Sequence, residues 1–148
     1  MMKKNLYVFT DGGARGNPGP AAISFIVKDS RGQILSKLGK YIGRATNNVA
    51  EYQAVIEALG WLKSNIPASP AGGQYPLSSI QFFLDSKLIV NQLNGYYKIK
   101  DAKLRNLIIK VRSFEQKING KIFYHFISRQ KNHHADFLVN QTLNKKIF

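Results

Sequence analysis

The chain has 148 residues, 44% of them hydrophobic, and its 22 lysines and arginines against eight carboxylates give a formal charge of +14. This length and apolar content predict one domain, residues 1–148, and the lack of cysteine excludes disulfides and thiolate metal sites. The charge predicts a polyanionic partner, and because the basic residues are scattered through every segment, nucleic acid ranks above a membrane surface.

The first third of the chain is predicted to form an antiparallel meander. Strand-like apolar runs cover residues 6–10 and 21–27, and a third strand is expected at 34–42. The glycine-rich segment 12–20 between the first two is predicted to be a hairpin loop. The first apolar run is too short for a signal peptide, and no run is long enough for a membrane span, so we expect an intracellular, cytoplasmic protein.

A helical pattern begins near Thr46. Apolar residues recur at three- and four-residue steps over residues 46–63, and Thr46 or Asn47 suits the cap. Segment 67–79, rich in proline, glycine and serine, is predicted to be a surface loop. The remaining elements are expected at residues 80–84 (strand), 85–93 (helix), 104–118 (helix), 121–127 (strand) and 132–145 (helix). This order implies an α/β fold with a mixed sheet covered by helices.

Four of the eight carboxylates lie in settings that suggest metal chemistry. Asp11 and Asp85 directly follow apolar strands, Glu51 follows Asn47-Asn48-Val49-Ala50, and Asp136 ends the segment 132–136. A strongly basic chain has little reason to place acids there unless a cation binds. Since thiolates are absent, we predict a hard divalent ion held by oxygen for phosphodiester hydrolysis. Without metal, these acids repel one another, so at least one pKa should rise.

Each acid also has an ordinary structural interpretation. Asp11-Gly12-Gly13 suits a hairpin turn and Asp85-Ser86 a helix cap, while Glu51 and Asp136 suit first helical turns. Taken singly, these explanations are adequate. Four acids together, with asparagines at the matching positions, favour the metal hypothesis.

Four segments of the chain together resemble type 1 ribonuclease H. They are residues 10–20, 46–51, 84–86 and 129–136, and they follow in order over nearly the whole domain. The resemblance implies an RNase H-like fold, a five-stranded mixed sheet of order 3-2-1-4-5 flanked by helices. It also implies a metal-dependent endonuclease that cuts the RNA strand of RNA/DNA hybrids by a two-metal mechanism, leaving 5′-phosphate and 3′-hydroxyl ends. The catalytic and metal-binding residues would be Asp11, Glu51, Asp85 and Asp136, with two Mg²⁺ or Mn²⁺ ions per site when substrate is bound.

The resemblance also suggests which residues contact the substrate. Discrimination between RNA and DNA must use the 2′-hydroxyl, which both donates and accepts a hydrogen bond. Phosphates would be held by lysines and arginines without regard to base sequence. Tyr96 and Tyr97 are available for stacking on bases, although packing against the sheet is their more ordinary role. The substrate contacts expected on these grounds are Gly12, Asn17, Thr46, Asn47, Asn48, Lys87, Lys98, Lys100 and Lys103.

Two departures from many bacterial members indicate a compact branch of the family. Residues 94–98 run almost directly into the next helix, so the usual basic protrusion is absent. Residues 128–132 are too few for the loop that carries a mobile histidine, and Arg129 is the first candidate to take its place, ahead of His133 and His134. His133 and His134 are expected to be exposed helix residues. We expect a monomer with no obligate protein partner. Two other functions remain as alternatives to the nuclease: a catalytically silent nucleic-acid-binding domain and a basic RNA- or ribosome-binding domain.

Overall fold

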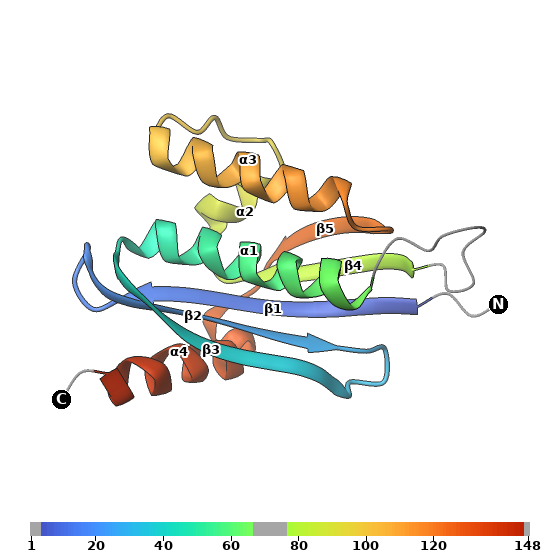
Figure 1. Ribbon diagram of the computed structural model, residues 1–148, viewed down its shortest axis with the longest axis horizontal. Helices are drawn as coiled ribbons and strands as arrows, with labels where there is room; N and C mark the ends of the chain where they lie inside the picture. Colours follow the sequence, from blue (N-terminus) through green and yellow to red (C-terminus); the bar gives the residue numbers. More distant parts are fainter. Residues whose placement is uncertain (1–3, 67–76, 147–148) are drawn as a thin grey trace.

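Five strands form one mixed sheet in the order β3-β2-β1-β4-β5 (Figure 1). The computed structural model describes residues 4–66 and 77–146. The first three strands are antiparallel neighbours, β4 pairs in parallel with β1, and β5 pairs in parallel with β4. The predicted α/β class and strand order are thus confirmed. The strands are β1 (Lys4–Ala14), β2 (Gly19–Lys28), β3 (Ile34–Ala45), β4 (Leu77–Leu84) and β5 (Lys121–Phe126).

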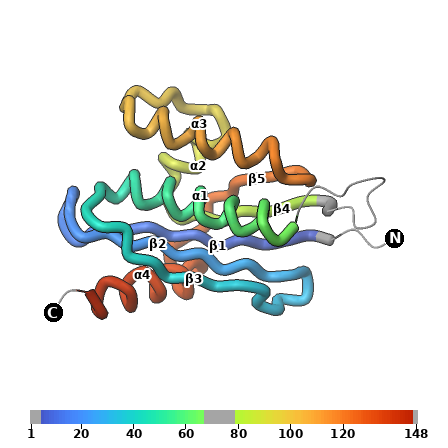
Figure 2. The backbone as a smooth tube through the Cα atoms, in the orientation of Figure 1, coloured from blue at the N-terminus to red at the C-terminus, as the bar shows by residue number. Residues whose placement is uncertain are grey.

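The helices lie on both faces of the sheet (Figure 2). On one face α1 packs against β1 and β2, and α3 packs on α1. On the other face α4 packs against β1, β2 and β3. Within the described ranges, no helix packs in this way against the second face of β4 and β5. The helices are α1 (Asn47–Asn65), α2 (Lys87–Leu93), α3 (Ala102–Gln116), the 3₁₀ turn η1 (Arg129–Asn132) and α4 (His133–Lys146).

The main core lies between the sheet and α1. Alternate residues of the strands, such as Val8, Ile23 and Phe82, are fully buried there against Tyr52 and Leu59 of α1. The predicted period of α1 is confirmed, and so is its cap, because the Thr46 side chain accepts a hydrogen bond from the Val49 amide. The core thereby fixes the orientation of α1 over β1.

Several predicted boundaries are wrong. Strand β1 continues through Asp11 and the two glycines to Ala14, so only residues 15–18 separate it from β2. Asp11-Gly12-Gly13 is therefore not a hairpin turn. Residues 77–79 belong to β4 instead of the predicted loop, whose residues 67–76 lie outside the described part. Glu51 lies one turn inside α1 rather than in its first turn, α3 ends at Gln116 before Asn119, and α4 begins after η1.

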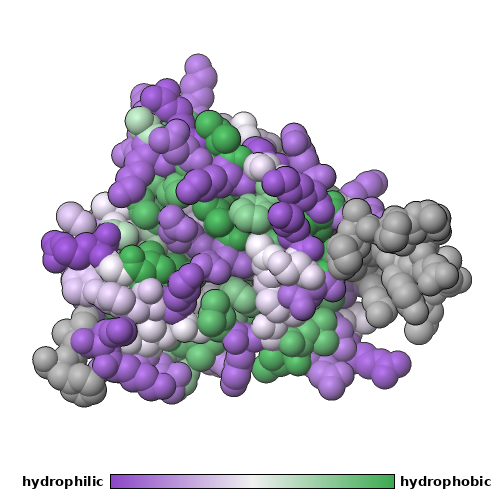
Figure 3. All heavy atoms as spheres, in the orientation of Figure 1, coloured by the Kyte–Doolittle hydropathy of each residue, from purple (hydrophilic) through white to green (hydrophobic). Residues whose placement is uncertain are grey.

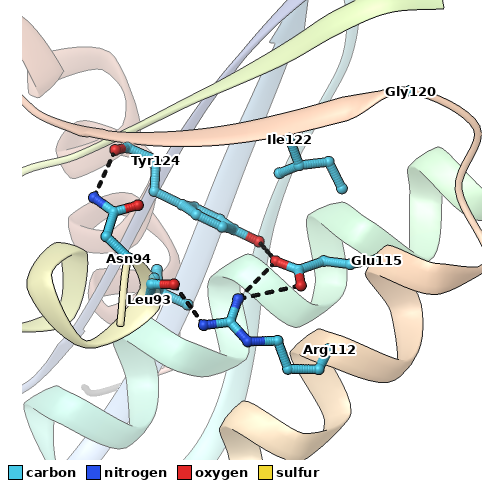
Figure 4. A pocket seen from close by; sticks show the side chains of 7 residues that line it. All are labelled: Leu93, Asn94, Arg112, Glu115, Gly120, Ile122 and Tyr124. Atoms are coloured by element: carbon cyan, nitrogen blue, oxygen red, sulfur yellow. Dashed lines mark hydrogen bonds and ion pairs between the residues drawn. The ribbon is translucent and has the colours of Figure 1, made fainter. Parts of the chain in front are cut away.

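A polar network joins α3 to β5 and to the end of α2 beside a cavity of about 410 Å³ (Figure 4). The Tyr124 hydroxyl donates to Glu115 Oε2 at 2.6 Å, and Arg112 Nη1 lies 3.1 and 3.0 Å from the two Glu115 oxygens. Arg112 Nη2 also donates to the Leu93 carbonyl at 2.5 Å. Burial, followed by the Glu115 charge, raises the pKa of Tyr124 well above its ordinary value. Both oxygens of Glu115 are therefore satisfied by donors.

Hydrophilic side chains cover much of α3 and alternate with apolar ones across the face seen in Figure 3. This agrees with basic residues distributed over the whole chain rather than along one helix. Among the helices described, none combines the length and the apolar content needed to cross a bilayer. The connection from α2 to α3, residues 94–101, contains no helix, as the compact branch requires.

Candidate active site

Three carboxylates from three separate elements meet near the carboxyl ends of β1 and β4. Asp11 lies within β1, Glu51 in α1, and Asp85 directly after β4. One carboxylate oxygen from each lies within 4.8 Å of the other two. Asp11 and Glu51 are both buried, and Asp85 is partly buried. The structure thus brings together three of the four predicted acids.

Gly12 sets the distance between β1 and α1. A Cβ atom at this position would lie 2.3 Å from the carbonyl carbon and oxygen of Ala50 and 2.6 Å from the Glu51 nitrogen. The backbones of the strand and the helix are therefore in direct contact, which only glycine permits. This contact holds Glu51 beside Asp11. Sequence analysis expected Gly12 to contact the substrate, and the structure gives it a packing role in addition.

Burial and mutual repulsion raise the pKa values of two acids in the cluster. Burial, the charge of Asp85 and then that of Asp136 raise the pKa of Asp11 to about 7, although hydrogen bonds with Glu51 and the Gly12 backbone oppose the shift. Burial and the charges of Asp11 and Asp85 raise the pKa of Glu51 well above its usual range, and its hydrogen bond to Asp11 adds to this. The expected rise in pKa is confirmed, because burial and neighbouring acids raise the pKa of both Asp11 and Glu51.

Asp136 stands beside this cluster without joining it. It lies in the first turn of α4 and is partly buried. Its charge contributes to the raised pKa of Asp11, so it lies within electrostatic reach. The group of acids whose oxygens lie within 4.8 Å of one another does not include it. Its catalytic role stays a prediction.

Asn132 is a site residue that sequence analysis did not assign. It ends η1 and is 1% exposed. Its side-chain nitrogen donates to the Thr10 carbonyl at 2.8 Å and to Asp85 Oδ2 at 3.0 Å. The amide therefore fixes one oxygen of Asp85 relative to β1. The available signal was its place in segment 129–136, four residues before Asp136.

The residues of the cluster fit a divalent cation. The donors are hard carboxylate oxygens, which Mg²⁺ and Mn²⁺ prefer. Glu51 Oε2 is buried without a hydrogen-bond partner. A buried acceptor of this kind costs free energy unless a donor or a cation reaches it. A cation among the three acids would satisfy this oxygen and offset the repulsion.

Two of the predicted substrate residues hold the β1–β2 loop against the start of α1. The Asn47 backbone amide donates to Asn17 Oδ1 at 2.9 Å, and the Ala14 amide donates to Asn47 Oδ1 at 2.9 Å. We call this pair of contacts the asparagine clasp. Thr46 is used in the adjacent helix cap. Hydrogen bonds therefore join the predicted substrate residues of the loop to those at the start of the helix.

The other predicted contacts lie at the surface. Lys87 is exposed at the start of α2, with its Nζ 5.4 Å from the Phe126 ring centroid, and Arg129 is exposed in η1. Asn48 is partly buried in the first turn of α1. Tyr96 and Tyr97 are 75% and 53% exposed, so the expectation that they pack against the sheet is wrong. Exposure is also seen for Lys98, Lys100 and Lys103.

The two histidines differ. His133 is exposed, as expected, and its Nδ1 lies 2.9 Å from the Gln130 carbonyl. His134 is partly buried, which departs from the expectation of an exposed residue. Burial, then the charges of Lys37, Lys28 and His133, lower the pKa of His134. His134 therefore faces a positively charged surface.

The fold agrees with comparisons to known proteins. The model of the RNase H family matches residues 3–144. This chain belongs to the RNase H family. Ribonuclease HI of Halobacterium salinarum is 34% identical over 139 residues, which make up 94% of this chain and 64% of that protein. The bifunctional protein Rv2228c of Mycobacterium tuberculosis is 34% identical over 135 residues, 90% of this chain and 34% of that protein.

This RNase H chain therefore spans less than two thirds of the length of those two relatives. Among solved structures, LC11-RNase H1 in complex with RNA/DNA hybrid superposes with a TM-score of 0.86 and 36% identity. That comparison covers 97% of this chain and 99% of the other. LC11-RNase H1 was isolated from compost by a metagenomic approach. The likeness covers the whole domain, including every element that carries a candidate residue.

Proposed function

We propose that the chain is a metal-dependent ribonuclease H that hydrolyses the RNA strand of RNA/DNA hybrids and leaves 5′-phosphate and 3′-hydroxyl ends. The observation that carries this proposal is the meeting of Asp11, Glu51 and Asp85 at one edge of the sheet. Membership in the RNase H family and the superposition on a relative crystallised with hybrid support it. Buried acids kept close at a cost to stability are expected where a cation is used in catalysis.

Asp11, Glu51 and Asp85, with Asp136 beside them, would hold Mg²⁺ or Mn²⁺. Two such ions, bound together with substrate, would supply an activated water and stabilise the charge on the phosphate and the leaving oxygen. Burial and neighbouring charges raise the pKa of Asp11 and Glu51, and metal binding would require their ionised forms, since only ionised carboxylates are full ligands. Asn132 keeps Asp85 oriented toward the cluster through its hydrogen bond.

Selection of the RNA strand is assigned to the surface around the asparagine clasp. The Gly12 backbone, Glu51 and the amides of Asn47 and Asn48 would form the hydrogen bonds to 2′-hydroxyls. Exposed Lys87 and Arg129 suit phosphates. That the protein acts as a monomer and in the cytoplasm stays a prediction. Light scattering on the purified protein would test whether it is a monomer.

The test is cleavage of an end-labelled RNA/DNA hybrid with and without Mg²⁺ or Mn²⁺. We expect metal-dependent internal cuts that leave 5′-phosphates, and a rate lower by about 10³-fold or more for Asp11→Asn, roughly 4 kcal/mol of barrier. A hybrid whose scissile strand is entirely deoxyribonucleotide should stay intact. Unchanged cleavage by Asp11→Asn would remove the mechanism, and binding of hybrid without any cleavage would support the silent alternative.

A further inference from the structure

A row of aromatic rings crosses the second face of the sheet, starting beside α4 at Phe9 and running over β4 to β5. Phe9, Phe83 and His125 are direct neighbours across β1, β4 and β5. Their ring centroids are 5.0 Å apart for Phe9 and Phe83 and 5.4 Å apart for Phe83 and His125, with nearly parallel planes. Tyr7 adds a fourth ring, 6.3 Å from Phe83. We call these four rings the aromatic row.

The outer end of the aromatic row is open to solvent. His125 is exposed, and Phe123, two residues earlier on the same face of β5, is 43% exposed. His125 Nε2 lies 2.5 Å from Gln81 Oε1, and Gln81 Nε2 donates to Ser79 Oγ at 3.0 Å. The His125 ring is thus held in place by polar contacts rather than by burial. An exposed ring of fixed orientation suits stacking by a planar ligand.

The inner end of the row adjoins a small basic hollow. Phe9 of β1 and its cross-strand neighbour Ile26 of β2 line a cavity of about 100 Å³. Its lining also includes four basic residues: Lys28, Lys131, His133 and His134. We call this cavity the basic pocket. The described residues that line it include no carboxylate. Lys28 Nζ lies 5.3 Å from the Phe9 ring centroid, which connects the pocket to the row. A small anionic group such as a phosphate is the complementary ligand.

Both features lie beside the candidate active site. Phe9 and Phe83 each precede a cluster acid, Asp11 and Asp85, by two residues. Residues two apart in a strand share a face, so the aromatic row is one step along β1 from Asp11. A nucleic-acid strand that leaves the carboxylates therefore reaches this face without crossing the sheet.

We propose that the aromatic row and the basic pocket form a binding site for single-stranded nucleic acid, with a phosphate in the pocket and bases on His125 and Phe123. The strand must be single because a base has to leave its duplex partner to stack on a ring. As an extension of the hybrid site, this inference rests on the proposed function. The proposed ligand class is a single-stranded stretch next to the hybrid, of either sugar type.

The experiment measures binding of a short fluorescent oligodeoxythymidine by anisotropy in EDTA over a range of salt. We expect Phe123→Ala and His125→Ala to weaken binding roughly fivefold or more, as loss of one stacked base would. Lys28→Gln should reduce the slope of log affinity against log salt by about 0.7. Matched controls on α3, Ile109→Ala and Lys110→Gln, remove an exposed apolar side chain and an exposed lysine and should bind like the unmodified protein.

Cleavage of a blunt hybrid by the same variants separates this inference from the proposed function. We expect Phe123→Ala, His125→Ala and Lys28→Gln to cut blunt hybrid at the unmodified rate. The inference is overturned if the unmodified protein does not bind the oligonucleotide, or if these variants bind it as tightly as the α3 controls do. Binding of polyglutamate of equal charge as tightly as the oligonucleotide would also overturn it, because the rings would then contribute nothing. Failure of the unmodified protein to cut hybrid would reject the proposed function and leave the binding result standing.

Discussion

Glu115 on the one hand and the cluster of Asp11, Glu51 and Asp85 on the other are partly or fully buried acids with opposite surroundings. Glu115 faces the Arg112 guanidinium and the Tyr124 hydroxyl, so that each of its oxygens accepts a hydrogen bond. Asp11, Glu51 and Asp85 face one another, and Glu51 Oε2 has no partner. The first group joins elements of the fold. The second costs stability, and its unpartnered carboxylate oxygen fits a bound cation.

The largest effect is expected from a substitution that pushes Glu51 away from Asp11. Gly12→Ala would place a methyl group 2.3 Å from the Ala50 backbone, so β1 and α1 must separate. We expect cleavage to be abolished and the free energy of unfolding to fall by about 3 kcal/mol, measured by hybrid cleavage and urea unfolding. Gly13→Ala is the control, since its Cβ meets Val139 Cγ1 at an ordinary 3.6 Å. Equal effects of the two substitutions would contradict the role given to Gly12.

Asn132 tests whether the cluster depends on positioning from outside it. In Asn132→Ala the Asp85 carboxylate loses its amide donor, and we expect Mn²⁺ affinity and cleavage each to fall roughly 10- to 100-fold. Isothermal titration with Mn²⁺ reports the metal affinity independently of activity. Asn140→Ala removes an exposed asparagine amide of α4 and should change neither quantity. Unaltered Mn²⁺ affinity in Asn132→Ala would show that the hydrogen bond from Asn132 is not needed to orient Asp85.

Neutralising one acid in each group should change stability in opposite directions. Glu51→Gln removes a repelled buried carboxyl, and we expect metal-free protein to gain about 1 kcal/mol or more. Glu115→Gln removes the charge that Arg112 faces, and we expect a loss of about 1 kcal/mol. Urea unfolding in EDTA measures both. A shift of the same sign in the two variants would show that the groups do not differ as described.

The smallest expected effect is a pH dependence of the metal-free protein. The pKa of Asp11 is raised from 3.8 to about 7, so the folded state holds a proton that the unfolded state releases. This contribution to stability is fully present below about pH 4 and is lost as pH rises to about 7. The stabilisation by Mg²⁺ should accordingly be larger at about pH 8 than at about pH 5, measured by thermal unfolding. Asp11→Asn should reduce this difference.

The sequence predicts what depends on repeated apolar residues. The period of α1 and the succession of strands and helices follow from patterns that many residues share, whereas the strand order comes from the family resemblance. The extension of β1 through Gly12 and Gly13 has no such pattern, because glycines carry no side chain to alternate between faces. Asn132 is missed for a related reason: its role rests on two hydrogen bonds to residues distant in sequence, which spacing does not reveal.

The asparagine clasp has a consequence for recognition. Because Asn17 and Asn47 are already engaged with the backbone at Ala14 and Asn47, their rotamers are set when the protein folds. Ordering of side chains is a main entropic cost of association, and here little of it is left for the encounter with substrate. Under the proposed function, we expect such a rigid template to select a duplex by its shape at first contact, because a duplex of different groove geometry would find no adaptable side chains there.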